Sequence, residues 1–412
     1  MELPTELIHT ISGHLELRDQ LFLCRTSHRL YAICVKWIYR VLDLKSPLQL
    51  VQCCKTIIAR PDAALSVWKL KIECVLSYTL KSFYTTLRSA ATRMENLRVI
   101  SICSPHLFGS ISDTVFPRLT DCTIPLLLDS ADSYSFLRRN PTIEFTILMP
   151  DPGQFISNNL YHIQPIHMPR LRHFIGSEIA ACNLVPGSPV SKIGIGWSPN
   201  SPIGYSRGLS AVASSTAEIC DLTAVIPSWD PALLSAIAQH TPRIQFLKIW
   251  APRLSGLTPE KEDFLAAMDT NLCSLTRLTN LTVADKTFLD RIADALESEF
   301  DRVRRWGDIC PTLNRVCLSG KPTAWFRWKG LWLPTNCFTD DPESDECLQW
   351  FIKKVVLSPE LPSDYHDLGE YFAGAAGMEI LTEAARKGEA LPTFHVLRKE
   401  GGGPVISFPS NS

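Results

Sequence analysis

The chain has 412 residues, of which 45% are hydrophobic and 20% are charged, and its formal net charge is −1. This composition is typical of a folded soluble protein and excludes a disordered chain; the length exceeds one compact domain of ordinary size unless the fold is an elongated repeat. A near-neutral chain lacks the clustered excess of Lys and Arg that nucleic-acid binding requires, so we expect no nucleic-acid partner.

The beginning of the chain and its cysteines indicate a compartment. Residues 1–6 are acidic and interrupted by Pro4, unlike the start of a signal peptide. No uninterrupted apolar run reaches about 18 residues, so we expect no membrane association. The 14 cysteines include no Cys-x-x-Cys pair, and many lie within apolar runs. We interpret them as reduced core thiols and expect a cytoplasmic and/or nuclear protein.

Residues 1–38 predict a small helical module. One face of a helix that begins after Pro4 carries four apolar residues, namely Leu7, Ile8, Ile11 and Leu15. A further apolar set predicts one or two more short helices, with Asp19 as the N-cap of a helix that starts near Gln20. So short a bundle buries little surface and is only marginally stable unless it docks on something.

The order of residues in this module follows a known pattern. The residues that carry it are Leu3, Pro4, Glu6, Leu7, Ile8, Ile11, Leu15, Asp19, Leu21, Leu23, Cys24, Ser27 and Leu30. This order resembles the F-box family. The resemblance implies a three-helix module that binds the Skp-type adaptor subunit of a cullin-based ubiquitin ligase. The positions that it assigns to adaptor contact are Leu3, Pro4, Leu7, Ile8, Ile11, Leu15, Leu21 and Leu23.

The chain departs from the family after Cys24. The basic-plus-tryptophan ending of many F-boxes is absent, and the residues from Thr26 to Leu30 stand in its place. The alternative interpretation of the module is an amphipathic helix hairpin that packs on its own protein.

A short strand-like pattern, apolar-x-x-apolar-x-apolar, recurs through residues 39–320 at intervals of roughly 20 to 35 residues. Clear copies begin at Tyr39, Val67, Leu97, Leu119, Val190, Ile244, Leu278 and Leu313, and weaker ones lie near Ile143, Leu171 and Ile219. Proline often stands two residues before a copy, where it ends the preceding helix and leads into extended chain.

The segments between the copies predict helices. Residues 48–59 carry helical apolar spacing, Asp230-Pro231 and Thr258-Pro259 each open a helix, and Phe288 begins a long amphipathic helix that runs to Val303. Stacked strand–helix units build a parallel sheet with a continuous core.

We therefore expect an α/β fold in three parts. Residues 1–38 form the three-helix F-box, and residues 39–320 form an irregular leucine-rich-repeat-like solenoid with parallel strands on the concave side and helices outside. Residues 321–412 form a C-terminal α+β cap. The consensus Asn of regular leucine-rich repeats is missing after most strands, and the region resembles the C-terminal part of fungal-type F-box proteins. The alternative is an ordinary α/β domain of alternating strands and helices.

The repeated pattern ends in the C-terminal region, where an aromatic cluster occurs. On one strand, Phe326, Trp328 and Trp332 would share a face. Trp325, Trp328 and Trp332 could anchor a partner, because Trp is enriched at binding hot spots. They could instead cap the last repeat, and we favour the cap. An acidic loop over residues 340–346, helices near Trp350 and over 371–385, and a hairpin between 394–397 and 405–408 follow.

The sequence holds few signs of chemistry. Gly194-Ile195-Gly196 is followed by Trp197 and lacks the third glycine of a dinucleotide fingerprint, and no phosphate-binding loop or Gly-x-Ser-x-Gly elbow occurs. His162, His167 and His173 share no helical face, so no zinc site is predicted. We expect a non-enzymatic protein without catalytic residues, metal or cofactor.

Three functions compete. The leading one is a substrate receptor of a Skp–cullin–F-box ubiquitin ligase, which binds a Skp-type adaptor, and through it a cullin, with its N-terminal helices. Its repeats would hold an unknown protein target, and its contribution would be effective concentration. The second is a repeat scaffold without a ligase role. The third is an α/β enzyme, which requires a pocket of clustered titratable residues.

Overall fold

The computed structural model describes residues 3–74, 81–126, 132–150, 165–199, 203–252, 259–285, 293–318, 324–335, 344–387, 395–398 and 404–407. Contacts divide the chain into two compact units, Met1–Ile219 and Cys220–Ser412. The division falls inside the region predicted as repeats, and the N-terminal helices belong to the first unit.

The first unit begins with three short helices, α1 (Thr5–His14), α2 (Leu17–Cys24) and α3 (His28–Ile38). Both α1 and α2 pack on α3. Helix α1 starts after Pro4, as predicted. Helix α2 starts at Leu17, because the extended backbone of Glu16 takes the N-cap position, so the prediction of Asp19 as an N-cap is wrong. Ser27 caps α3 by accepting a hydrogen bond from the Leu30 amide at 3.2 Å.

Seven parallel strands follow in the described residues of the first unit, in the order of the chain. They are β1 (Val41–Leu44), β2 (Lys69–Ile72), β3 (Val99–Ile102), β4 (Asp121–Leu126), β5 (Phe145–Pro150), β6 (His173–Ser177) and β7 (Lys192–Gly196). Each strand coincides with a predicted copy of the repeated pattern. The alternate apolar residues of the pattern, such as Leu70 and Ile72, are buried on the face of the sheet that the helices cover.

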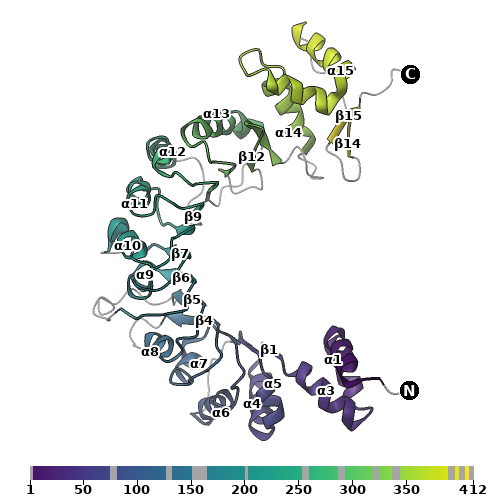
Figure 1. Ribbon diagram of the computed structural model, residues 1–412, viewed down its shortest axis with the longest axis vertical. Coiled ribbons are helices and arrows are strands. Elements are labelled where there is room, and N and C mark those ends of the chain that lie inside the picture. The colour runs from purple at the N-terminus through teal and green to yellow at the C-terminus, as the bar shows by residue number, and fades with distance from the viewer. Residues whose placement is uncertain are drawn as a thin grey trace. The chain divides into compact units, whose positions relative to one another are not determined.

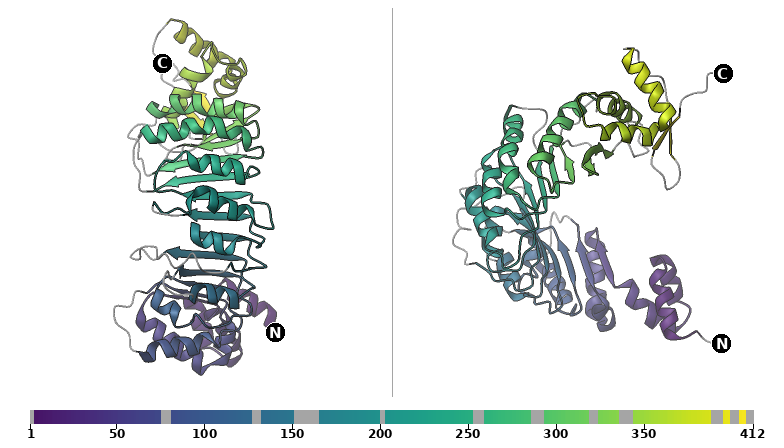
Figure 2. Two further views of the ribbon diagram at one scale, coloured as in Figure 1. Left: turned by 90° about the vertical axis from the view of Figure 1, so that its left-hand side faces the viewer. Right: turned by 45° about the horizontal axis from the view of Figure 1, so that its top comes forward.

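Helices connect these strands and cover one face of the sheet (Figure 1). They are α4 (Pro47–Ala59), α5 (Pro61–Ser66), α6 (Lys81–Ala91), α7 (Pro105–Gly109), α8 (Asp132–Arg139), α9 (Glu178–Leu184) and α10 (Gly204–Ala213). In the left view of Figure 2 the helices of this unit stand in front of its strands. The predicted helix over residues 48–59 is α4.

The second unit continues with strand–helix pairs. Its parallel strands are β8 (Asp221–Val225), β9 (Phe246–Ala251), β10 (Asn280–Asp285) and β11 (Arg315–Cys317). Its helices are α11 (Ala232–His240), α12 (Pro259–Asn271) with a 3₁₀ turn η2 (Leu272–Ser274), and α13 (Ala293–Ile309). Helix α11 follows Asp230-Pro231 but starts one residue later than predicted, because Pro231 takes the N-cap position; Asp230 Oδ1 still accepts a hydrogen bond from the Ala232 amide at 2.9 Å. Phe288 and Thr258 lie outside the described residues.

The end of the second unit is a mixture of hairpins and helices. It holds β12 (Trp325–Trp328), β13 (Leu331–Pro334), α14 (Ser344–Phe351), a π-helical turn η4 (Ile352–Val356), α15 (Asp364–Arg386), β14 (His395–Arg398) and β15 (Pro404–Ser407). Strands β14 and β15 pair antiparallel, which confirms the predicted C-terminal hairpin. Residues 340–343 of the predicted acidic loop lie outside the described residues.

The aromatic cluster is a hairpin rather than one strand. Lys329 and Gly330 turn the chain with φ angles of 50° and 89°, which place Trp332 on β13 opposite Arg327 of β12. The prediction that Phe326, Trp328 and Trp332 share a face of one strand is therefore wrong.

Polar side chains join successive strand–helix units. Asn96 donates to the Leu65 carbonyl at 2.7 Å, and Thr142 donates to the Leu119 carbonyl at 2.7 Å. In the second unit, Thr279 donates to the Gln245 carbonyl at 3.0 Å and Thr312 to the Leu278 carbonyl at 2.8 Å. Each of these bonds satisfies a backbone carbonyl of the preceding strand–helix pair.

Candidate functional site

The N-terminal helices expose large apolar side chains. The side chains of Leu3, Leu7, Ile11, Leu17, Leu21 and Phe22 are each between 45% and 58% exposed. We call these six residues the N-terminal apolar face. Scattered exposed apolar residues are normal on proteins, but six within the first 22 positions mark a surface that is suited to contact another molecule.

The interior of the same helices is polar. Ser12 is fully buried in α1, and Gln20 is the buried residue of α2. Gln20 Nε2 donates to the Ser12 carbonyl at 2.9 Å and to the Leu15 carbonyl at 3.0 Å, and Ser12 Oγ lies 3.6 Å from Cys34 Sγ. The only buried residues of α1 and α2 are therefore polar, whereas several of their large apolar residues are exposed to solvent.

The predicted contact residues divide between surface and interior. Leu3, Pro4, Leu7, Ile11 and Leu21 are exposed. Ile8, Leu15 and Leu23 are half-buried. Leu17 and Phe22 were not among the predicted contact residues, although Leu17 stands four positions before Leu21 on α2, a spacing that predicts a shared helical face.

Trp37 fixes α1 against α3, and the sequence analysis did not single it out. Its ring lies against Gly13, where an added Cβ would come within 2.7 Å of the indole, and its centroid is 4.9 Å from that of His9. Only a glycine at position 13 allows this approach without displacement of the ring.

The helical module joins the first strand directly. Helix α3 ends at Ile38 and β1 begins at Val41. Helix α3 also packs on α5, where the Arg60 guanidinium lies 5.1 Å from the Tyr31 ring centroid and 5.9 Å from that of Tyr39. The helices that bear the N-terminal apolar face are thus packed against the rest of the first unit.

In the second unit, β9 presents two aromatic side chains on the face opposite its helices. Phe246 and Trp250 are each 42% exposed, whereas Leu247 and Ile249 point the other way and are buried. Lys248 stands between the two aromatics, with its ammonium 5.8 Å from the Trp250 ring centroid. We call Phe246 and Trp250 the β9 aromatic pair, another surface that the sequence analysis did not single out.

The predicted tryptophan patch is largely interior. Trp325 and Trp332 are buried, and of the three tryptophans Trp328 alone is exposed. Trp325 Nε1 donates to Glu299 Oε2 of α13 at 3.0 Å. In this arrangement Trp325 and Trp332 pack the end of the sheet and present no surface to a partner, which favours the cap interpretation.

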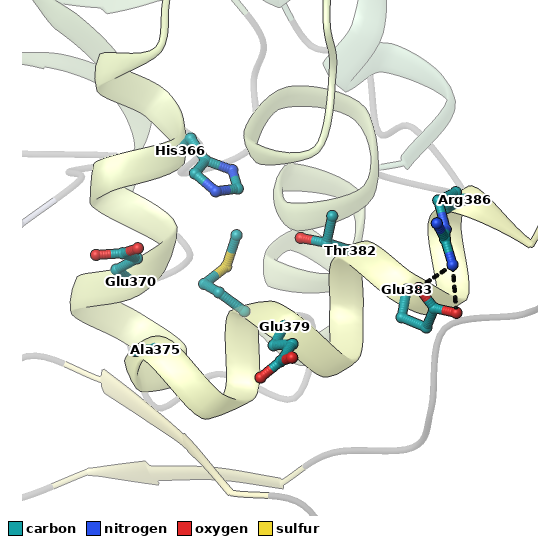
Figure 3. Close-up of a pocket in the computed structure, with 8 residues that line it drawn as sticks. His366, Glu370, Ala375, Glu379, Thr382, Glu383 and Arg386 are labelled. Atoms are coloured by element: carbon teal, nitrogen blue, oxygen red, sulfur yellow. Dashed lines mark hydrogen bonds and ion pairs between the residues drawn. The ribbon is translucent and has the colours of Figure 1, made fainter.

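One pocket of the second unit gathers titratable residues. A cavity of about 380 Å³ along α15 is lined by His366, Glu370, Glu379, Glu383 and Arg386, among others. Figure 3 shows the carboxylates of Glu370 and Glu379 pointing away from the His366 ring, and Glu383 is engaged by Arg386 at 2.8 Å. The geometry does not set a carboxylate against the imidazole.

The remaining findings bear on metals and membranes. Across the described ranges, no group of His, Cys, Asp or Glu is arranged to hold a metal ion. Within the same part of the chain, no helix combines the length and the apolar character that a bilayer span requires.

No family model matches the sequence. No curated protein matches it either.

Proposed function

We propose that this protein is a substrate receptor of a Skp–cullin–F-box ubiquitin ligase, in which an F-box binds the Skp-type adaptor and a leucine-rich-repeat-like solenoid binds a target. The observation that carries the proposal is the packing of α1 and α2, in which the polar Ser12 and Gln20 are buried and the N-terminal apolar face is exposed. Such a surface is costly in a lone protein and is stabilised when a partner covers it.

The mechanism is proximity. The adaptor would link the chain to a cullin, and a charged ubiquitin carrier elsewhere in the complex would supply the chemistry. The receptor would raise the effective concentration of target lysines at that carrier, so it needs no nucleophile. The direct join between α3 and β1 supports this role, because it leaves little freedom between the first strand and the helices that bind the adaptor.

The test is binding of the purified full chain to a purified Skp-type adaptor, measured by calorimetry. Leu7→Asp combined with Ile11→Asp should weaken binding by about 30-fold or more, because each introduces a charge at the centre of a desolvated contact. Leu48→Asp on α4 is the matched control, since Leu48 is 67% exposed but lies outside the N-terminal apolar face. Absence of wild-type binding, or equal loss in the control, would refute the proposal.

A second candidate, a repeat scaffold without a ligase role, is favoured by the β9 aromatic pair. Exposed aromatics on a sheet are a common anchor for protein partners. Affinity purification of the wild-type chain with mass spectrometry separates the two functions. Recovery of an adaptor and a cullin supports the receptor, whereas recovery of other partners that Phe246→Ser with Trp250→Ser releases, without adaptor or cullin, supports the scaffold.

A further inference from the structure

Four residues of the first unit form a row at the amino end of its sheet. Arg40, Trp68, Arg98 and Thr120 each stand immediately before a strand, from β1 to β4. The Trp68 amide donates to the Arg40 carbonyl, the Arg98 amide to the Trp68 carbonyl and the Thr120 amide to the Arg98 carbonyl, each at 2.9 Å. Adjacent members are therefore about one strand spacing, roughly 4.8 Å, apart.

A cavity of about 820 Å³ opens beside this row. Its lining includes four cations, Lys36, Arg40, Arg98 and Arg118. We call this cavity the basic pocket. Sites that hold small organic ligands have volumes of roughly 300 to 1,000 Å³, so the basic pocket has room for an anion with an organic body.

Among the lining residues of the basic pocket, four are cations and one, Asp62, is a carboxylate. The lining carboxylate of Asp62 is engaged by Arg60 at 2.7 Å, and this hydrogen bond holds the pKa of Asp62 below its usual value. Within the described residues, none of the four cations is hydrogen-bonded or ion-paired to a carboxylate. All four cations are exposed, and like charges around one cavity repel one another unless an anion joins them.

Stacking holds one of these cations in place. The Arg40 guanidinium lies 4.7 Å from the Trp37 ring centroid and 5.6 Å from that of Trp68. Trp68 is the row member between Arg40 and Arg98, so the Arg40 guanidinium is held by two aromatic rings beside the row. A guanidinium that is already ordered loses less entropy when its N–H groups bind an anion.

We propose that the basic pocket binds a phosphate monoester. A phosphomonoester carries close to two negative charges at pH 7 and offers three acceptor oxygens, and these match paired guanidinium groups better than a monoanion does. The ester's organic body would contact the apolar and aromatic lining, such as Val35 and Tyr31. The proposal is independent of adaptor binding, because it involves no residue of the N-terminal apolar face.

Calorimetry on the full chain at low salt tests the proposal with phenyl phosphate as the probe and phenyl sulfate, a monoanion of similar shape, as the comparison. We expect phenyl phosphate to bind at least 10-fold more tightly than phenyl sulfate. Arg98→Gln combined with Arg118→Gln should weaken phenyl phosphate binding by about 10-fold to 100-fold, as loss of hydrogen bonds to a charged group does.

A phosphoserine peptide distinguishes the sources of the phosphate monoester. Tighter binding than phenyl phosphate assigns the site to a phosphorylated protein segment, and equal or weaker binding assigns it to a small molecule.

Arg172→Gln is the matched control. Arg172 is exposed and also stands immediately before a strand, β6, but it does not line the basic pocket. Its replacement removes one positive charge from the same unit and should leave binding unchanged. Equal affinity for phosphate and sulfate, no binding of either, or an equal loss in Arg172→Gln would overturn the proposal. Circular dichroism of each variant shows whether the fold is retained, and Arg98→Lys with Arg118→Lys, which keeps the charge, should retain part of the affinity.

Discussion

Glu299 on α13 is a carboxyl group whose burial raises its pKa above the ordinary value, against the smaller opposing effects of the Trp325 hydrogen bond and the charges of Lys261 and Arg302. The folded protein therefore holds this proton more tightly than the unfolded chain does. The contribution of Glu299 to the free energy of unfolding is greatest below the pKa of an ordinary glutamate and falls as the pH rises through the folded pKa.

The pH dependence of stability that follows from the raised pKa of Glu299 can be tested by substitution. Glu299→Gln keeps an acceptor for Trp325 Nε1 and removes the titration, so the variant should be more stable than wild type at pH 7, with the difference closing toward pH 4. Urea denaturation followed by tryptophan fluorescence measures it. Glu297→Gln on the same helix is the control, because its ion pair with Lys354 is exposed and such pairs are worth at most about 1 kcal/mol. A difference that grows toward acid pH would contradict this assignment.

Thiol reactivity provides a second test at the residue scale. Burial raises the pKa of Cys54 and of Cys122 to about 12. At pH 8 a thiol of that pKa is ionised in only about one molecule in 10⁴, and the thiolate is the reactive form. Cys103 and Cys273 are exposed. We expect alkylation with peptide mapping to label Cys103 and Cys273 first, and Cys54 and Cys122 only in denaturant; early labelling of Cys122 would show that this part of the sheet opens.

At the scale of elements, a buried ion pair joins α12 to the end of β10. Lys261 Nζ lies 2.8 Å from Asp285 Oδ2, and the two side chains are 6% and 0% exposed. The Lys261 ammonium also lies 5.7 Å from the Trp229 ring centroid. Because both side chains are buried, loss of one of them removes an ion pair that solvent cannot readily replace.

Asp285→Asn should therefore destabilise the protein by about 3 to 5 kcal/mol. Lys261→Met combined with Asp285→Leu removes both charges and should cost less than Asp285→Asn alone. Urea denaturation of the wild type, Lys261→Met, Asp285→Leu and the double variant gives the coupling energy between the two side chains. If the double variant is the least stable of the set, the ion pair itself makes a net contribution to stability, and the expectation is wrong.

The elements differ in how well the sequence predicts them. The strands were predictable because each repeated pattern places alternate apolar residues where the helices bury them, as at Ile100 and Ile102. The turn at Lys329-Gly330 was missed, although a glycine between two aromatic runs is compatible with the positive φ of a tight hairpin. The basic pocket was not predictable, because Arg40, Arg98 and Arg118 come together only once the strands are in register.

The N-terminal helices show a further limit of sequence patterns. Periodicity identifies an apolar and a polar face on α1 and α2 but does not state which one the protein buries. The F-box resemblance selected the apolar face as a contact surface, and the inward position of Ser12 and Gln20 is a fact of packing that periodicity cannot supply. Leu17 and Phe22 were missed because they were absent from the positions that the resemblance assigned.

At the scale of the whole molecule, the N-terminal apolar face should govern solution behaviour. Exposed apolar surface of this kind promotes association between copies when no partner covers it. We expect the wild-type chain, purified alone, to form concentration-dependent oligomers in size-exclusion chromatography with light scattering. Leu7→Asp with Ile11→Asp should shift it toward monomer, and Leu48→Asp should not. A wild-type chain that stays monomeric at high concentration would show that this face is not adhesive.

The strand order in each unit has a consequence for synthesis. Within each unit, every described parallel strand after the first pairs with the strand that precedes it in the chain, as β2 does with β1 and β9 with β8. A nascent chain thus completes each pairing as soon as the next strand leaves the ribosome, without waiting for distant segments. Folds built from contacts of short sequence separation form quickly, because each step closes only a short loop. Helices α1 to α3 precede the strands in the chain, so the N-terminal apolar face is available to a partner while the strands are still being translated.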